Sequence, residues 1–152
     1  MRLAPGSLAL LLAMSLAVAG CRAPARIVEI RDLDAAEGVM DRLPVGAQGL
    51  LELTFTHSMY GGWVAESYAV GPELRRIAVR TEMAAAAEYY ARYGNTRPVA
   101  DGWLVEVAPL ALARLLIRVD RVGDPALSVA GRRVALLSLV PDGHLVEVRV
   151  AQ

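Results

Sequence analysis

The chain has 152 residues, with 16 basic and 16 acidic side chains and a formal net charge of zero at neutral pH. Nucleic-acid binding requires an excess of basic residues against the phosphates, so this balance argues against a nucleic-acid partner. The chain contains one cysteine, Cys21, and therefore cannot form a disulfide within itself.

The first residues have the pattern of an export signal. Arg2 precedes an apolar run from Leu8 to Val18, and the small residues Ala19 and Gly20 stand directly before Cys21. A bilayer-spanning helix needs about 20 apolar residues, which is more than this run offers, and no later stretch is both apolar and long enough. We therefore predict no transmembrane helix.

The residues around Cys21 resemble the lipobox of bacterial lipoproteins. This resemblance implies that a peptidase removes residues 1–20 as a lipoprotein signal peptide and that the thiol of Cys21 carries a diacylglyceryl group. Each buried CH₂ of an acyl chain contributes about 0.8 kcal/mol, so two or three chains hold a protein at the membrane. The alternative is an ordinary signal peptide in which the cysteine is incidental.

Behind the signal we expect a short tether, residues 21–26, and one β domain, residues 27–152, which is long enough for a single core. The predicted protein is a monomer of the cell envelope that is exported and touches the membrane through its lipid anchor. Arg22, rather than Asp, follows the cysteine. By analogy with enteric lipoproteins, the destination is the periplasmic face of the outer membrane where the host has one, and otherwise the outer face of the plasma membrane.

The domain begins with a predicted hairpin. Ile27–Ile30 and Val39–Leu43 are its strands, and the polar segment Asp32–Gly38 is its turn. The three carboxylates of this turn lack the spacing of a calcium-binding loop, so we interpret it as a solvated hairpin tip without a metal.

The clearest strand follows. Its apolar side is Leu51, Leu53, Phe55 and His57, in strict alternation with polar residues. Gly61-Gly62 then supplies a tight turn, and residues 63–70 return as the next strand. Further strands are predicted at 74–80, 103–107, 114–119, 126–130, 133–140 and 145–150, separated by turn signals rich in Gly, Pro and Asp.

One segment, Met83–Tyr93, is predicted as a short helix. It is rich in alanine, it is followed by Gly94, and it places Ala86, Tyr89, Tyr90 and Tyr93 on one face. Docking of this face on a sheet is preferred to a role as a ligand wall. The predicted fold class is therefore all-β and mainly antiparallel, a small β-sandwich or open barrel with one short helix.

His57 and Glu66 form a polar pair that is a candidate for a functional site. A turn centred on Gly61-Gly62 places them directly opposite each other, and a looser turn over Met59–Gly62 leaves them diagonal on the same face. Because His57 continues an apolar series, the pair is expected to point inward. It can act as a base oriented by a carboxylate, as a ligand-binding pair, or as a structural hydrogen bond that fixes the register.

The sequence offers neither a well-placed nucleophile for catalysis nor a set of further ligands for a metal beside His57 and Glu66. Ser58 follows His57 directly on the strand, so its side chain leaves from the opposite face and is not placed as a nucleophile. The only other histidine, His144, lies in a turn and brings no ligand set with it. We expect no enzyme activity, no catalytic residue, no metal and no cofactor. The predicted binding residues are His57, Ser58, Tyr60, Trp63, Glu66 and Tyr68.

Several segments together resemble the uncharacterised family called domain of unknown function 1850. They are Arg31-Asp32 through Gly38, Leu43-Pro44-Val45, the strand Leu51–Ser58, Glu66-Ser67-Tyr68 and Asp101-Gly102-Trp103. The resemblance covers nearly all of residues 27–150, and its core is a His-Ser pair followed by a Glu on the return strand. It implies an exported small β domain that is frequently associated with tripartite (TRAP) transporters, and it implies no reaction.

The expected function is that of a membrane-anchored envelope lipoprotein, serving as an accessory or ligand-binding module with a transporter or another envelope protein as partner. Two alternatives remain, a structural interaction module without a ligand and, with the smallest support, a small hydrolase using His57 and Glu66. A binding module requires an open pocket around the predicted residues, whereas a structural module requires that the pair be sealed by packing.

Overall fold

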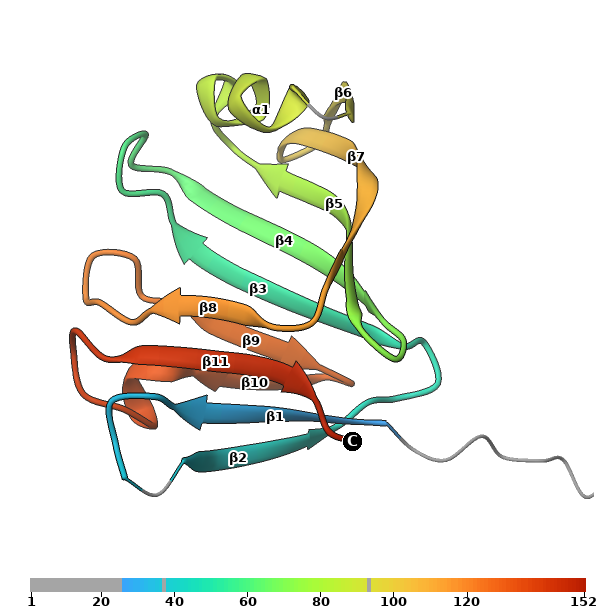
Figure 1. Cartoon of the computed structure of the whole chain (residues 1–152). Coiled ribbons are helices and arrows are strands. Elements are labelled where there is room, and N and C mark those ends of the chain that lie inside the picture. The colour runs from blue at the N-terminus through green and yellow to red at the C-terminus, as the bar shows by residue number, and fades with distance from the viewer. Residues whose placement is uncertain (1–25, 37, 93) are drawn as a thin grey trace, which may run out of the picture.

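The computed structural model describes residues 26–36, 38–92 and 94–152 (Figure 1). The predicted signal peptide, Cys21 and residues 21–25 of the tether lie outside these described residues, as does Tyr93. Within them the chain forms eleven strands in two sheets, with antiparallel pairing at every interface, and one α-helix. The predicted all-β class with one short helix is confirmed, and the architecture is a sandwich rather than a closed barrel.

The smaller sheet has four strands in the order β2-β1-β11-β8. It pairs the two ends of the domain, because β1 lies beside β11 with Val28 opposite Val150. Its strands are β1 (Ile27–Asp32), β2 (Val39–Pro44), β8 (Leu115–Arg118) and β11 (Leu145–Val150).

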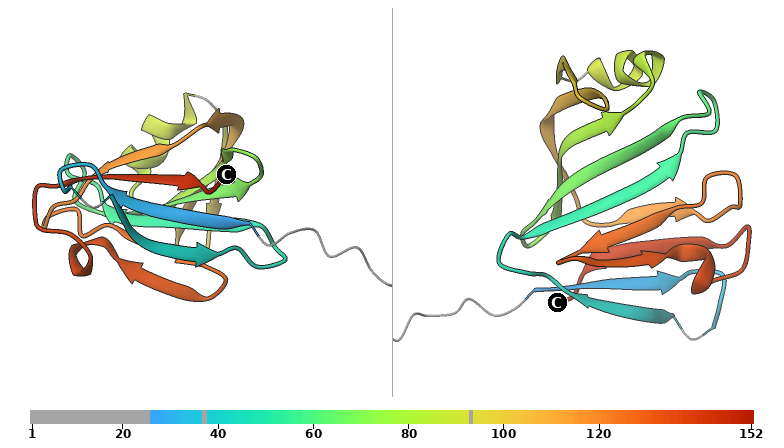
Figure 2. Two further views of the ribbon diagram at one scale, coloured as in Figure 1. Left: turned by 60° about the horizontal axis from the view of Figure 1, so that its bottom comes forward. Right: turned by 180° about the vertical axis from the view of Figure 1, so that it is seen from behind.

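The larger sheet has seven strands in the order β10-β9-β3-β4-β5-β7-β6. Its middle is the β3–β4–β5 meander, which Figure 2 shows from two further directions. Its strands are β3 (Leu50–Thr56), β4 (Trp63–Val70), β5 (Leu74–Thr81), β6 (Gly94–Val99), β7 (Gly102–Leu112), β9 (Ala126–Val129) and β10 (Arg132–Ala135).

Two hydrophobic clusters cover the larger sheet. The first lies between the sheets and includes Ile30, Leu51, Leu127 and Val148, all fully buried. The second lies under the helix α1 (Ala84–Ala91), where Ala87 packs on the valines of β4, β5 and β7. The smaller sheet and α1 therefore each cover a part of the larger one, and Figure 1 shows α1 near β5 and β7, away from β8.

The alternation of β4 explains how one strand serves both clusters. Val64, Glu66, Tyr68 and Val70 share one face and are all buried, because side chains two residues apart point to the same side of a strand. Val64 belongs to the cluster under α1, and Tyr68 and Val70 belong to the cluster between the sheets. Glu66 thus lies at the boundary of the two.

Several observed elements differ from the predicted ones, among them β7, which extends from Gly102 to Leu112 instead of ending at Val107. Residues 94–99 form the edge strand β6, which was not predicted; its Pro98 is tolerated at an edge because an edge residue has a free side. Residues 133–140 do not form one strand, since the chain turns into the short 3-10 helix η1 (Leu136–Ser138), which buries Leu136. The helix is shorter than 83–93, and Tyr89, predicted on its packed face, is 51% exposed.

No helix in the described part of the chain is long and apolar enough to cross a membrane.

Candidate functional site

The β3–β4 hairpin has a different register from the predicted one. Leu53, not His57, lies opposite Glu66, and Phe55 lies opposite Val64. The turn is longer because His57 itself closes it: its N–H donates to Gly62 O and its carbonyl accepts from Gly61 N–H, both at 2.8 Å. The prediction that His57 and Glu66 face each other, directly or diagonally, is therefore wrong. They share a face, separated along the hairpin.

Glu66 is instead held by groups from three elements. Its side chain is buried, with the residue 7% exposed. The hydroxyl of Tyr68, two residues along β4, donates to Oε2, and the hydroxyl of Tyr90 on α1 donates to Oε1 at 3.0 Å. Nη1 of Arg76 on β5 lies 3.5 Å from Oε1. The carboxylate thus links the sheet to the helix that covers it.

The two tyrosines serve as hydrogen-bond donors. Burial raises the pKa of both phenols, and the neighbouring Glu66 carboxylate raises the pKa further, because a second negative charge beside it is unfavourable. Arg76 opposes this effect only in part. Tyr68 and Tyr90 are therefore protonated at neutral pH and keep their O–H bonds directed at the carboxylate.

His57 belongs to an aromatic group at the end of β3. Its Nδ1 accepts the N–H of Met59 at 3.2 Å. Its ring centroid lies 4.7 Å from that of Tyr60 and 6.0 Å from that of Tyr89, and Phe55 lies on its other side at 6.4 Å. The imidazole is therefore positioned by the turn and by aromatic packing rather than by Glu66.

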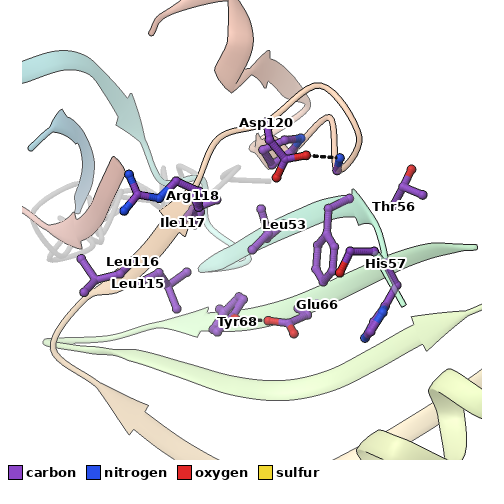
Figure 3. Close-up of a pocket in the computed structure, with 14 residues that line it drawn as sticks. Leu53, Thr56, His57, Glu66, Tyr68, Leu115, Leu116, Ile117, Arg118 and Asp120 are labelled. Atoms are coloured by element: carbon purple, nitrogen blue, oxygen red, sulfur yellow. Dashed lines mark hydrogen bonds between the residues drawn. The ribbon is translucent and has the colours of Figure 1, made fainter. Parts of the chain in front are cut away.

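A cleft of about 360 Å³ opens between the two sheets beside Glu66. Its floor comes from β3 and β4 and its opposite wall from β8 and the following loop, as Figure 3 shows. The lining residues are Leu53, Phe55, Thr56, His57, Ser58, Glu66, Tyr68, Leu115, Leu116, Ile117, Arg118, Asp120, Gly123 and Pro125. The loop is fixed to the floor by the hydrogen bond from Thr56 N–H to Gly123 O, 2.7 Å long.

A second hollow, of about 320 Å³, lies on the helix side of Glu66. It is lined by Glu66, Arg76, Tyr89, Tyr90 and Arg92. In the described part of the chain, Nε of Arg76 is buried and has no hydrogen-bond acceptor. In the polar cluster of Glu66, Tyr68, Arg76 and Tyr90, Glu66 lines both hollows, whereas Tyr68 lines the cleft and Arg76 and Tyr90 line the second hollow.

Four of the six predicted binding residues line the cleft: His57, Ser58, Glu66 and Tyr68. Tyr60 contacts the ring of His57 instead. Trp63 is next to Val64 on β4 and so points to the other face of the sheet, where the guanidinium of Arg80 lies 5.9 Å from its ring centroid.

Arg76 and Tyr90 were not among the predicted site residues. Arg76 shares the inner face because the β5 register shifts between Arg76 and Ala78, which places Arg76 and Val79 on one side despite their odd spacing. Tyr90 was predicted on the packed face of the helix, but its partner depends on how that helix docks. The alternation of β4 alone does place Glu66 beside Tyr68.

A potential metal-binding group occurs elsewhere, at the β1–β11 end of the smaller sheet. Asp32, Asp34 and His144 offer ligand atoms within 4.8 Å of one another. The ligand atoms already have hydrogen-bond partners: His144 Nδ1 lies 2.8 Å from Asp32 Oδ2, and the backbone N–H of Leu145 donates to Asp34 Oδ2 at 2.8 Å. The Arg118 guanidinium 3.4 Å from Asp34 disfavours a cation there. We interpret this group as a structural hydrogen-bond network that joins the end of β1 to the start of β11.

No protein-family model, curated protein or solved structure matches this chain. The resemblance to domain of unknown function 1850 stays a prediction, and the candidate site stands on its geometry.

Proposed function

We propose that this protein is a membrane-anchored ligand-binding module of the cell envelope and that the cleft beside Glu66 is its binding site. The main support for this proposal is that Glu66 and Tyr68, two members of the polar cluster, line an open cleft instead of being sealed by packing. A residue that served only to join β4 to α1 would need no access from the space between the sheets.

The chemistry of the cleft supports binding. Its floor and wall are mainly apolar, with Leu53, Phe55 and Ile117 among them, and Glu66 and Asp120 provide convergent polar groups. Small-molecule and peptide sites have this composition, because apolar surface supplies affinity and a few fixed polar groups supply orientation. Arg76 supports the site from outside the cleft, because it lines the second hollow and supplies the countercharge of Glu66.

The proposed cellular location of the module rests on the sequence. The leader and Cys21 support an exported, lipid-anchored protein, and the resemblance to the transporter-associated family supports an accessory role beside a solute transporter. A hydrolytic role has no such support. His57 Nδ1 accepts the Met59 N–H, and Ser58 follows it on an exposed turn. The structural interaction module remains the alternative that the binding experiment tests.

A pair of tryptophan variants tests the cleft. Ser58 lines the cleft, and its neighbour Met59 does not and is 73% exposed. Fragments that contain carboxylates, amines or neutral aromatic groups would be screened by ligand-observed NMR against the wild-type protein, Ser58→Trp and Met59→Trp. We expect fragments that bind the wild type and Met59→Trp but not Ser58→Trp, because the indole fills the cleft mouth. No hits, or equal hits for both variants, would overturn the proposal.

A further inference from the structure

We propose that the ligand of this cleft is an extended peptide, which adds as a strand to the free edge of β8 with every second side chain directed into the cleft. This inference rests on the proposed function, since it names the class of ligand for the same site. It comes from the position of β8, which is the edge strand of the smaller sheet and forms a wall of the cleft with all four of its residues.

The backbone of β8 has hydrogen-bonding groups directed to the open side. In an antiparallel pair, residues alternate between those that bond the neighbouring strand and those that point away. Val119 N–H donates to His144 O in line with the β8–β11 register, so Ile117 and Leu115 bond β11. The N–H and C=O groups of Leu116 and Arg118 therefore point away from β11. In the described part of the chain, no strand pairs with that side.

The space beside this edge is bounded by the larger sheet. That sheet continues past β8, and α1 packs on it mainly over β5, β7 and β6 and reaches Val64 of β4. The uncovered part is the floor of the cleft, with Phe55 and Glu66. A strand paired to β8 places alternate side chains toward this floor, because side chains along a strand alternate between its faces.

The charges favour a basic side chain on the inward face of such a peptide. Asp120 stands at the end of the cleft, with Oδ1 occupied by the N–H groups of Val122 and Gly123. Arg118 is directed elsewhere, since its Nη1 donates to Gly143 O at 2.7 Å and pairs with Asp34. The inward surface therefore combines apolar groups with an acidic end.

The other sheet edges are protected against strand addition. Edges in native proteins are blocked by proline, by charge or by bulges. Edge strand β6 contains Pro98, β2 has a register shift near its start and ends at Pro44, and β10 begins with Arg132-Arg133. In β8 the segment Leu115-Leu116-Ile117 has none of these features, and the charge of its last residue, Arg118, is directed to Gly143 O and Asp34.

A second copy of the chain does not fit this edge. Figure 1 shows β3, β4 and β5 of the larger sheet beyond β8, so a second copy that approached this edge with its own β8 would meet the larger sheet. A single extended strand carries no sheet. Strand addition by a peptide is an established recognition mode, in which main-chain hydrogen bonds give affinity and pockets for alternate side chains give specificity.

A display library of random peptides is the probe, panned on the protein produced from the full chain and purified in detergent. We expect enriched sequences with apolar residues at every second position and a basic residue in the same phase. N-methylation of the selected peptide at alternate amides should abolish binding, and N-methylation at the intervening amides should be tolerated, because only one set of N–H groups faces β8.

Two variants at one position separate the backbone from the side chain. Leu116→Pro removes the outward N–H without removing a β8–β11 hydrogen bond, and proline is accepted on a free edge. Leu116→Ala keeps the N–H and is the matched control, since the Leu116 side chain is 51% exposed. Both variants lose the leucine side chain, which lines the cleft, and they differ in the N–H, so we expect peptide affinity to be about tenfold or more lower in Leu116→Pro than in Leu116→Ala, as for the loss of one hydrogen bond.

Amide hydrogen exchange followed by NMR keeps the test independent of the variants. In the free protein the amides of Leu116 and Arg118 should exchange quickly and that of Ile117 slowly, and the selected peptide should protect the first two. Peptides that bind without this protection, or with no alternation in the N-methyl series, would overturn strand addition. Fragments that distinguish Ser58→Trp from Met59→Trp while no peptide binds would reject the peptide and leave the proposed function standing.

Discussion

Glu66 is the residue on which the cleft and the fold both depend. Its two carboxylate oxygens accept from Tyr68 and Tyr90, which come from β4 and α1, and Arg76 on β5 supplies the countercharge. Substitution of Glu66 should destabilise the fold, because a buried hydrogen-bond donor that loses its acceptor retains the full cost of its desolvation. Binding assays with Glu66 variants therefore need a stability measurement beside them.

Glu66→Gln should lower the free energy of unfolding by roughly 1.5–3 kcal/mol, the range for hydrogen bonds to charged groups. A glutamine amide offers one acceptor oxygen, and its NH₂ group faces a second tyrosine hydroxyl that also donates. Urea unfolding would measure the change. The matched control is Glu106→Gln, whose ion pair with Arg97 is 59% exposed on both sides and should contribute less than about 0.5 kcal/mol. Equal losses for the two variants would contradict this view of Glu66.

The buried carboxylate of Asp32 should make the folding stability of the protein depend on pH in the acid range. Burial opposes its ionisation, but the hydrogen bonds from His144 and from the Asp34 N–H outweigh burial, and its pKa lies below the ordinary 3.8. A carboxyl with a lowered folded-state pKa contributes stability that is complete above its unfolded pKa and is lost as the pH falls through the folded value. Glu29, held by Arg42 and Arg149, acts in the same direction.

Asp32→Asn therefore should lower the melting temperature at pH 7 and reduce its dependence on pH below about 4. Melting curves between pH 7 and the acid limit of folding, for the wild type and the variant, test both parts. A variant with an unchanged acid dependence would show that Asp32 does not contribute through its charge.

At the scale of the element, the turn between β6 and β7 supports the helix side of the larger sheet. Gly102 has a φ of +129°, and a Cβ there would lie 2.3 Å from Thr81 O on β5. Gly102→Ala should therefore cost roughly 2–3 kcal/mol, from backbone strain and from the displacement of β5. Gly61→Ala is the control, since its φ is +73° with no atom within 4 Å of the added Cβ, and it should cost about 1 kcal/mol from strain alone. Urea unfolding that gives equal losses would exclude the contact with Thr81 as the cause.

The sequence predicts strands where the side-chain alternation is strong. The strand 145–150 and the return strand 63–70 have the predicted bounds, because burial on one face dictates their pattern. The strand β6 has exposed residues over most of its length and carries no such pattern, and it forms because β7 offers it an edge. The segment 136–140 has the hydrophobicity of a strand, but Leu136 and Val140 are buried through a turn.

The candidate site was predictable only as far as local spacing reaches. Glu66 and Tyr68 follow from alternation within β4. The predicted pairing of His57 with Glu66 depended on the length of the turn between β3 and β4. The observed turn is longer, so the residue opposite Glu66 is Leu53 instead of His57. Arg76 and Tyr90 reach Glu66 through a bulge in β5 and through the docking of α1, both of which are tertiary features. The β8 wall comes from a distant part of the chain that the sequence does not relate to the hairpin.

At the scale of the whole molecule, the start of the domain and one part of the cleft lining lie at opposite ends of the sandwich. Ala151 N–H donates to Ile27 O, so both ends of the domain meet at one end of the smaller sheet. The turns after Thr56 and Val119, which carry Ser58 and Asp120, lie at the other end, as Figure 1 shows. Four residues lie between Cys21 and Arg26, and five steps along the chain span at most about 18 Å.

A lipid anchor on Cys21 would therefore hold the domain close to its membrane by the end opposite the turns that carry Ser58 and Asp120, so that this part of the cleft lining is directed away from the lipid. We expect metabolic labelling with a palmitate analogue to mark the wild-type protein and Cys21→Ser to lose both the label and its place in the membrane fraction, because two or three acyl chains supply nearly all of the membrane affinity. Ser58→Trp, at the opposite end, is the control and should retain both. A labelled Cys21→Ser variant would contradict the anchor, and with it the orientation, while the argument for the cleft, which rests on residues 26–152, would be unaffected.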